Sequence, residues 1–376
     1  MGFFVSYKRI FCLLIPSGKI FVFKRENRNK MMTRKIFTFI FLIAVFFFLG
    51  FSCGNDGITH KNVTGKAGEV LVVIPDETWN GKVGNTMKPV LSNAQLSLPQ
   101  EEPIFDVINI PPKAFKEIFK TTRNIINVRI SPTLDSAKIE FKKDVWAWPQ
   151  AVVNIQAQTQ DSFIKIFNAN SDKIVAFMLK AERDRLQMNY AKNYDKAIKN
   201  DLLKKFDIDL TVPVGFVIAS QKADFMWLRY DTPDITQGIA IYTLPYTSDS
   251  TFTENYLLNK RDSVFRKNIE GPSKGSYMTT EHRLPSVLNI FEYRNNYAAE
   301  IRGLWKVEND FMGGPFVNLT VLDASKKRVI VLDGFVYAPR FDKRNYLRQV
   351  EAMIYSLKLP DQAENDKIKS QINMGN

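Results

Sequence analysis

The chain has 376 residues, of which 45% are hydrophobic, and a formal net charge of +13, a composition typical of a packed globular protein. Residues 1–52 carry nine of the 52 basic side chains and one of the 39 acidic ones, which leaves the rest of the chain with a net charge of only +5. This distribution argues against nucleic-acid binding, which needs a concentrated basic face.

Few side chains suited to catalysis or metal binding are available. The only cysteines are Cys12 and Cys53, and the only histidines are His60 and His282. Cys12 lies before the signal peptide described below, and Cys53 directly follows that signal peptide. The protein that remains after cleavage therefore has no cysteine pair for a disulfide or a metal site. Two isolated histidines argue against a catalytic triad or a histidine metal site. We therefore expect no metal and no other cofactor.

Residues 31–52 are typical of a bacterial signal peptide. A short basic start, Met31–Lys35, precedes an uncharged run over residues 36–50, which is shorter than the roughly 20 apolar residues of a membrane span. The residues just before Cys53 resemble a lipobox, so we expect acyl chains such as palmitate on Cys53 and a membrane anchor. The alternatives are an ordinary cleaved signal with an incidental cysteine and an uncleaved anchor helix.

The rest of the chain is expected to divide into a tether and two lobes. Residues 1–30 are predicted to be an extended or non-native leader. Residues 53–68 are polar with several glycines, which predicts a flexible tether. An N-terminal lobe is expected over residues 69–206, a C-terminal lobe over residues 207–360 and a polar tail over residues 361–376.

Apolar runs bounded by turn residues predict the strands of both lobes. In the N-terminal lobe they are expected over residues 70–74, 105–110, 124–130, 139–145 and 151–158. In the C-terminal lobe they are expected over residues 212–219, 225–230, 238–244, 287–293, 297–306, 316–323 and 328–338. A short polar turn joins the last two strands into a hairpin.

Three helices are predicted most clearly. Residues 161–206 contain neither glycine nor proline, and from Ser171 onward they predict one long helix. Another helix is expected over residues 255–268. The last helix places apolar residues on one face from Tyr346 onward, and Asp342 is its expected N-cap.

No catalytic motif is convincing on its spacing. Gly271–Gly275 matches the pattern GxSxG, but the charged residues before it favour a simple turn over a nucleophile elbow. Several carboxylates fall near predicted strand ends, so a periplasmic hydrolase that uses paired carboxylates or a serine is the alternative function. These carboxylates belong to Asp231, Asp234, Glu300, Glu308 and Asp310.

Two segments are candidates for a binding surface. Tryptophan and arginine are enriched at binding hot spots, and glycine lets a backbone approach a partner closely. The alternative is that the tryptophans fill the core while the glycines shape a tight hairpin. The candidate residues are Trp146, Trp148, Arg302, Trp305, Gly313 and Gly314.

Four stretches together resemble a known family. They are Gly68–Val73, Arg229–Tyr246, Gly271–Glu281 and Ile301–Tyr355. Over nearly all of its length after the signal, the chain resembles Bacteroidetes lipoproteins of the domain-of-unknown-function family 4837 (DUF4837). The resemblance implies a location in the cell envelope, and it brings no activity and no catalytic residue with it.

These patterns predict an α+β fold with two lobes, in which helices pack on mixed, mostly antiparallel sheets. The leading functional hypothesis is a non-enzymatic binding or assembly module. We expect lipid to hold it on the inner or outer membrane, facing the periplasm or the cell surface. Its further partner is expected to be a protein, a glycan or a small molecule.

Overall fold

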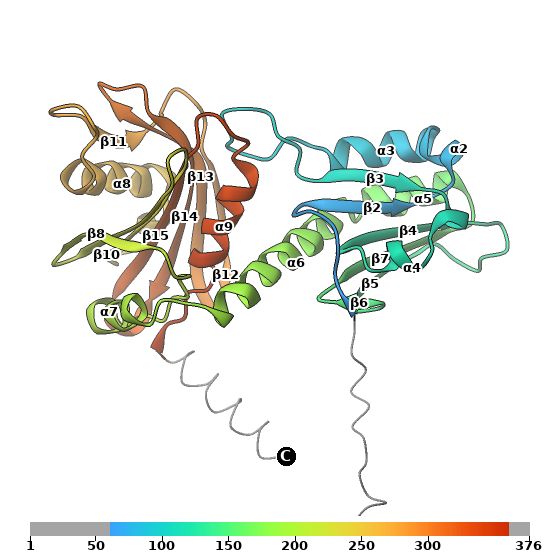
Figure 1. Ribbon diagram of the computed structural model, residues 1–376, viewed down its shortest axis with the longest axis horizontal. Coiled ribbons are helices and arrows are strands. Elements are labelled where there is room, and N and C mark those ends of the chain that lie inside the picture. The colour runs from blue at the N-terminus through green and yellow to red at the C-terminus, as the bar shows by residue number, and fades with distance from the viewer. Residues whose placement is uncertain (1–60, 361–376) are drawn as a thin grey trace, which may run out of the picture. The chain divides into compact units, whose positions relative to one another are not determined.

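The computed structural model describes residues 61–360, so the predicted leader, the signal peptide, Cys53 and the polar tail lie outside this range. The fold is α+β, as predicted, with a five-stranded sheet in the first half and an eight-stranded sheet in the second half (Figure 1). Within residues 61–360, no helix is both long enough and apolar enough to cross a membrane.

The first sheet consists mostly of parallel strands, in the order β3-β2-β4-β7-β5. Only β5, at one edge, runs antiparallel to its neighbour. β2 is apolar after its first residue, as expected for a parallel strand that is buried on both faces. The strands, close to their predicted bounds, are β2 (Glu69–Val73), β3 (Asp106–Ile110), β4 (Asn124–Ile130), β5 (Lys138–Lys143) and β7 (Ala151–Ala157).

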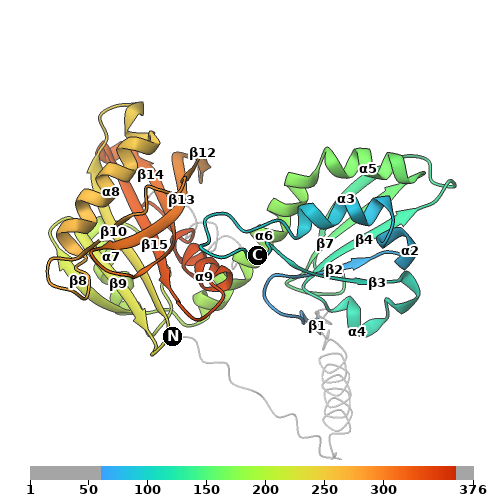
Figure 2. The same ribbon diagram turned by 90° about the horizontal axis from the view of Figure 1, so that it is seen from above.

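Helices cover the two faces of this sheet unequally. Side chains of α3, α5 and α6, including Met87 and Phe163, build the core on one face. The short α4 and the rings of Phe115 and Trp146 cover the other face. Figure 2 shows α3 and α5 on one side of the sheet and α4 on the other. The helices are α2 (Asp76–Trp79), α3 (Lys82–Leu91), α4 (Glu117–Lys120), α5 (Gln160–Asn168) and α6 (Ser171–Lys192).

The end of the predicted tether is part of the first lobe. Lys61 and Asn62 form β1, which pairs in parallel with β6 (Ala147–Trp148). The backbone N–H of Thr64 donates a hydrogen bond to the carbonyl oxygen of Thr121, just after α4, at 2.8 Å. The polar composition of this segment predicted flexibility, but its backbone groups find partners on elements that are distant in sequence.

The long helix predicted to reach Phe206 is broken at residues 193–195. α6 ends at Lys192, and α7 spans Lys196–Phe206. Asp195 begins α7, because its side chain accepts hydrogen bonds from the backbone N–H groups of Ala197 and Ile198. The apolar side chains of α7 pack in the core of the second sheet. α7 therefore packs with the second sheet and not with the first.

The second sheet is antiparallel throughout. Its order is β11-β13-β14-β15-β10-β9-β8, and β12 also pairs with β13. The predicted hairpin is present as β14 and β15, whereas the strand expected from residue 212 begins only at residue 217. The strands are β8 (Val217–Lys222), β9 (Phe225–Asp231), β10 (Thr236–Pro245), β11 (Tyr277–Thr280), β12 (Val287–Tyr293), β13 (Asn296–Glu308), β14 (Gly313–Asp323) and β15 (Arg328–Tyr337).

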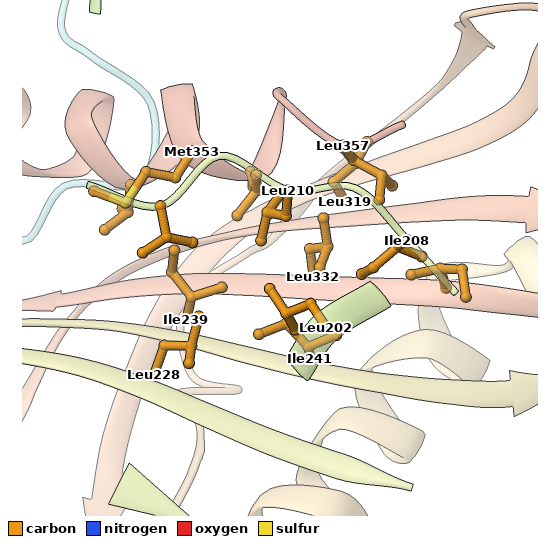
Figure 3. Close-up of a cluster of buried hydrophobic side chains, with 14 of the residues drawn as sticks. Leu202, Ile208, Leu210, Leu228, Ile239, Ile241, Leu319, Leu332, Met353 and Leu357 are labelled. Carbon is orange, nitrogen blue, oxygen red and sulfur yellow. The ribbon is translucent and has the colours of Figure 1, made fainter. Parts of the chain in front are cut away.

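Alternating side chains give the second sheet two apolar faces. Ile239 and Ile241 of β10 belong to one core, whereas Ala240 and Tyr242 belong to the other. α7 and α9 (Arg344–Ile354) pack on the first face, whose side chains are drawn in Figure 3. α8 (Glu254–Asn268) packs on the second face, next to β11.

A residue of the first lobe caps α9. Glu102 accepts hydrogen bonds from the backbone N–H groups of Lys343 at 2.6 Å and Arg344 at 2.8 Å. A carboxylate at this position satisfies N–H groups that have no partner within the helix and interacts favourably with the helix dipole. The predicted cap, Asp342, is exposed and makes no cap hydrogen bond within the described chain.

Candidate functional site

The residues predicted to form a binding surface do not come together. Trp146 is half-buried in the first lobe against Phe115, with ring centroids 5.3 Å apart. Trp148 lies in β6 and is 41% exposed. The other four candidates lie on β13 and β14 of the second sheet. The two segments therefore belong to different parts of the fold.

Trp305 fills the core, and two glycines make room for it. Its side chain is 2% exposed and donates a hydrogen bond from Nε1 to the carbonyl oxygen of Val336 at 3.2 Å. A Cβ atom on Gly314 would come within 2.1 Å of that same oxygen, and one on Gly313 would come within 2.9 Å of the Trp305 carbonyl oxygen. These three residues therefore follow the alternative expectation, in which tryptophan fills the core and the glycines shape a tight hairpin.

Arg302 is not part of an open surface. Its side chain is 13% exposed and contacts Glu300 at 2.8 Å and Glu351 at 2.9 Å. Burial alone would lower the pKa of Arg302, but the charges of the two carboxylates outweigh burial and raise that pKa well above its usual value. Because Glu351 belongs to α9, Arg302 fastens this helix to β13.

A pocket lies over the aromatic face of the second sheet. Three strands each supply two side chains that are two residues apart and therefore point to the same face. Thr236 of β10, Met278 of β11, the loop after α8 and the turn before β14 complete the walls. The pocket has a volume of about 290 Å³, close to the lower end of the volumes typical of ligand sites. The strand residues are Trp227 and Arg229 of β9, Trp305 and Val307 of β13, and Phe335 and Tyr337 of β15.

A glycine makes room for one of the aromatic rings on the neighbouring strand. Gly238 of β10 pairs with Phe335 of β15, and a Cβ atom on Gly238 would come within 2.2 Å of the Phe335 ring. Phe335 and Trp305 have ring centroids 5.9 Å apart, and Phe335 and Trp227 have centroids 6.4 Å apart. The three rings thus form a continuous aromatic floor.

Trp227 has an unused hydrogen-bond donor. Its side chain is half-buried, and its Nε1 atom is shielded from solvent without a hydrogen-bond partner among the residues that the structure describes. A buried polar group without a partner costs about 1–3 kcal/mol. Trp227 lines the pocket, so a small turn of its ring would bring this N–H to a ligand oxygen, whereas Trp305 already uses its own indole N–H.

The mouth of the pocket is charged. A second hollow of about 640 Å³ shares four wall residues with the first, so the two form one groove. In this outer part, Asp231 contacts Arg229 at 2.7 Å and accepts a hydrogen bond from Thr236 at 2.6 Å. Arg340 lies 3.8 Å from Asp234. The groove is therefore aromatic at its inner end and polar, with balanced charges, at its outer end.

A buried ion pair lies on the same face of the sheet. Arg261 of α8 is fully buried and contacts Asp333 of β15 through two hydrogen bonds, at 2.8 and 3.2 Å. The rings of Phe265 and Phe316 lie 4.4 and 3.9 Å from the guanidinium carbon. All the groups of this pair are satisfied by protein contacts, so we assign it to the attachment of α8.

The groups considered for catalysis are engaged in other contacts. Ser273 lies in a turn, as predicted, and donates a hydrogen bond to Asp310 at 2.8 Å. Glu308 contacts Lys306 at 2.9 Å, and Glu300 contacts Arg302. Within residues 61–360, no group of three or more histidine, cysteine or acidic side chains is arranged to hold a metal ion.

Sequence reasoning found one wall of this groove and missed the others. Trp305 was a candidate, but Trp227, Phe335 and Tyr337 were assigned only to strands. The available signal was the spacing of two residues between large side chains on β9 and β15. That signal identifies a shared face within each strand, but it does not show that strands more than 100 residues apart share one sheet.

Two solved structures are similar to part of the chain. The Ran-binding protein Mog1p of Saccharomyces cerevisiae is 9% identical, with 41% of this chain and 90% of that chain covered and a TM-score of 0.27. A mutant of the protein Mog1 is 11% identical, with 42% and 92% covered and a TM-score of 0.26. These likenesses are too weak to support an argument about function. No curated protein matches the chain.

Two family models match consecutive parts of the chain, and the junction between them falls at the break between α6 and α7. The DUF4837 family, expected over nearly all of the chain after the signal, is matched only by the second of these parts, while the first part matches a separate model. Residues 63–191 match a domain of unknown function (DUF8532), and residues 195–356 match the domain of unknown function DUF4837.

Proposed function

We propose that this protein is a lipid-anchored envelope protein that binds a small molecule in the groove over its second sheet and catalyses no reaction. The observation that carries the proposal is a pocket with walls of Trp227, Trp305, Phe335 and Tyr337, in which the Trp227 indole N–H has no partner among the described residues. Small-ligand sites combine apolar and aromatic walls with a few polar groups. The sequence around Cys53 supports the anchor.

The groove fits a ligand with a flat apolar body and a polar end. Aromatic rings stack on flat apolar surfaces, and the Trp227 N–H requires an oxygen acceptor. The polar end would lie beside Arg229 and Asp231, which are 41% and 42% exposed and can remain hydrated. An aromatic acid and a sugar ring both have this character.

Dye binding to the full chain in mild detergent tests this proposal. Anilinonaphthalene sulfonate has a flat aromatic body and sulfonate oxygens, and its fluorescence rises in an apolar pocket. We expect Trp227→Phe to weaken binding by up to about tenfold, because it removes a hydrogen bond that contributes about 1 kcal/mol. Thr236→Trp should abolish binding by filling the point where the two hollows meet. Trp79→Phe, a change in the core of the first lobe, is the control.

Unchanged melting temperatures would show that the variants fold. Equal dye binding by the wild type, Trp227→Phe and Thr236→Trp would contradict the proposed site. Native mass spectrometry gives an independent measurement on protein isolated from envelopes. We expect an extra mass that is lost on denaturation and is absent from Thr236→Trp.

A further inference from the structure

Three short elements meet where the described chain begins. β1 pairs with β6, and the backbone N–H of Val63 donates to the carbonyl oxygen of Trp148 at 3.2 Å. Thr64 bonds to Thr121, whose hydroxyl donates to the carbonyl oxygen of Ile118 in α4. Figure 2 shows β1 next to α4. These contacts bring the start of the lobe, α4 and β6 onto one surface.

Large apolar side chains are exposed on this surface. Ile118 of α4 is 75% exposed, and Val145 and Trp148, just before and in β6, are 37% and 41% exposed. Apolar side chains that gather on a surface mark interaction sites, in contrast to single exposed residues. Tryptophan is especially suited to the boundary between water and lipid, where its ring is covered while its N–H stays hydrated.

Lysines surround these apolar side chains. Lys61 of β1 is exposed, and Lys113, Lys116 and Lys120 lie in or next to α4. Glu117 is the only acid between residues 113 and 120. The hydrogen bond from Lys120 lowers the pKa of Glu117 most, and the charge of Lys61 lowers it further. The surface therefore carries a local excess of three positive charges.

We propose that this anchor-side surface, formed by Lys61, Lys113, Lys116, Ile118, Lys120 and Trp148, lies on the head groups of an anionic lipid bilayer. The inference rests on the proposed function, because it requires the lipid at Cys53. Lys61 follows Cys53 by eight residues, and an extended chain spans at most about 3.6 Å per residue, so the chain allows no more than about 29 Å between Cys53 and Lys61.

Charge and chemistry favour a bilayer as the occupant. Lysines near an anionic membrane are attracted by its negative surface potential. The acyl chains of a lipidated Cys53 would hold the protein on the membrane, and the lysines with Ile118 and Trp148 would set the orientation of the first lobe. An anchor and a basic patch are the two signals that together give stable membrane attachment.

Site-specific labelling of the acylated full chain tests the orientation. Ile118→Cys carries an environment-sensitive fluorophore, and Val217→Cys, at a site that is 59% exposed on β8, is the matched control. The chain is reconstituted on vesicles of phosphatidylcholine and phosphatidylglycerol that contain a nitroxide-labelled lipid. We expect several-fold stronger quenching at residue 118 than at residue 217. Lys113→Glu with Lys116→Glu, or high salt, should reduce that quenching.

Flotation of the vesicles separates the two proposals. A chain that does not float overturns the anchor and, with it, the docking surface. A chain that floats with equal quenching at residues 118 and 217 overturns the docking surface alone. Shielding of residue 118 in native envelopes but not on pure lipid vesicles would assign the surface to a protein partner and also overturn the proposal.

Discussion

At the scale of single residues, burial decides what an ion pair contributes. Arg302 and Arg340 each pair with a carboxylate, that of Glu300 and that of Asp234. The side chains of Arg302 and Glu300 are 13% and 11% exposed, whereas those of Arg340 and Asp234 are 81% and 47% exposed. Removing one partner of a buried pair leaves the other charge without compensation, but removing a partner of an exposed pair has little effect.

Arg302→Ala should therefore lower the free energy of unfolding by about 3–5 kcal/mol, since it leaves Glu300 and Glu351 buried without their shared cation. Arg340→Ala, which removes one partner of an exposed pair, is the control and should melt close to the wild type. Thermal unfolding followed by circular dichroism measures both. Equal shifts for the two variants would contradict the structural role of Arg302.

Glu351 should make the protein sensitive to acid. Burial alone would raise the pKa of its carboxyl, but Arg302 and Arg183 hold that pKa below its usual value. A pKa that is lowered by folding contributes stability above the unfolded value of about 4.3, and this contribution is lost as the pH falls.

The melting temperature should thus fall between about pH 5 and pH 3 more steeply for the wild type than for Glu351→Gln. Glu117→Gln is the control, because Glu117 forms an exposed pair with Lys120 and should leave the acid slope nearly unchanged. Identical slopes for the wild type and Glu351→Gln would show that another group controls acid stability.

At the scale of elements, sequence patterns predicted the strands and helices that depend on residues near one another in the chain. β2, β14 and β15 were expected near their observed bounds, because continuous apolar runs identify strands buried on both faces. The cap of α9 by Glu102 and the pairing of β1 with β6 were not predictable, since their partners lie far away in sequence. The break before α7 did have a local signal, because Asp195 is a good N-cap residue. The prediction of one long helix relied on the absence of glycine and proline and overlooked this signal.

Gly238 and Phe335 give a test of the packing between β10 and β15. A Cβ atom at Gly238 would meet the Phe335 ring at 2.2 Å, so Gly238→Ala should cost about 1–3 kcal/mol by overpacking. Adding Phe335→Leu to Gly238→Ala should recover part of the lost free energy of unfolding, because leucine is smaller than phenylalanine and leaves room for the new Cβ atom. Denaturant unfolding of both single variants and the double variant measures the coupling. Additive costs would contradict the proposed contact.

At the scale of the whole molecule, the groove depends on strand order more than on any motif. β9, β13 and β15 each carry two wall residues, and the order of the second sheet sets their spacing. The sequence predicted the α+β class and identified Trp305 as a residue of either the core or a binding surface. It did not indicate that Trp305 forms a wall of a pocket. A single sequence contains no signal for which strands become neighbours across a long connection.

The anchor at Cys53 is the central claim about the molecule in its cell, and metabolic labelling with an acyl analogue tests it most directly. We expect the wild type and the control Cys12→Ala to carry the label and to sediment with membranes. Cys53→Ala should lose the label and leave the membrane fraction or fail to mature. An unlabelled wild type, or a Cys53→Ala variant that is as fully labelled and membrane-bound as the wild type, would contradict the anchor.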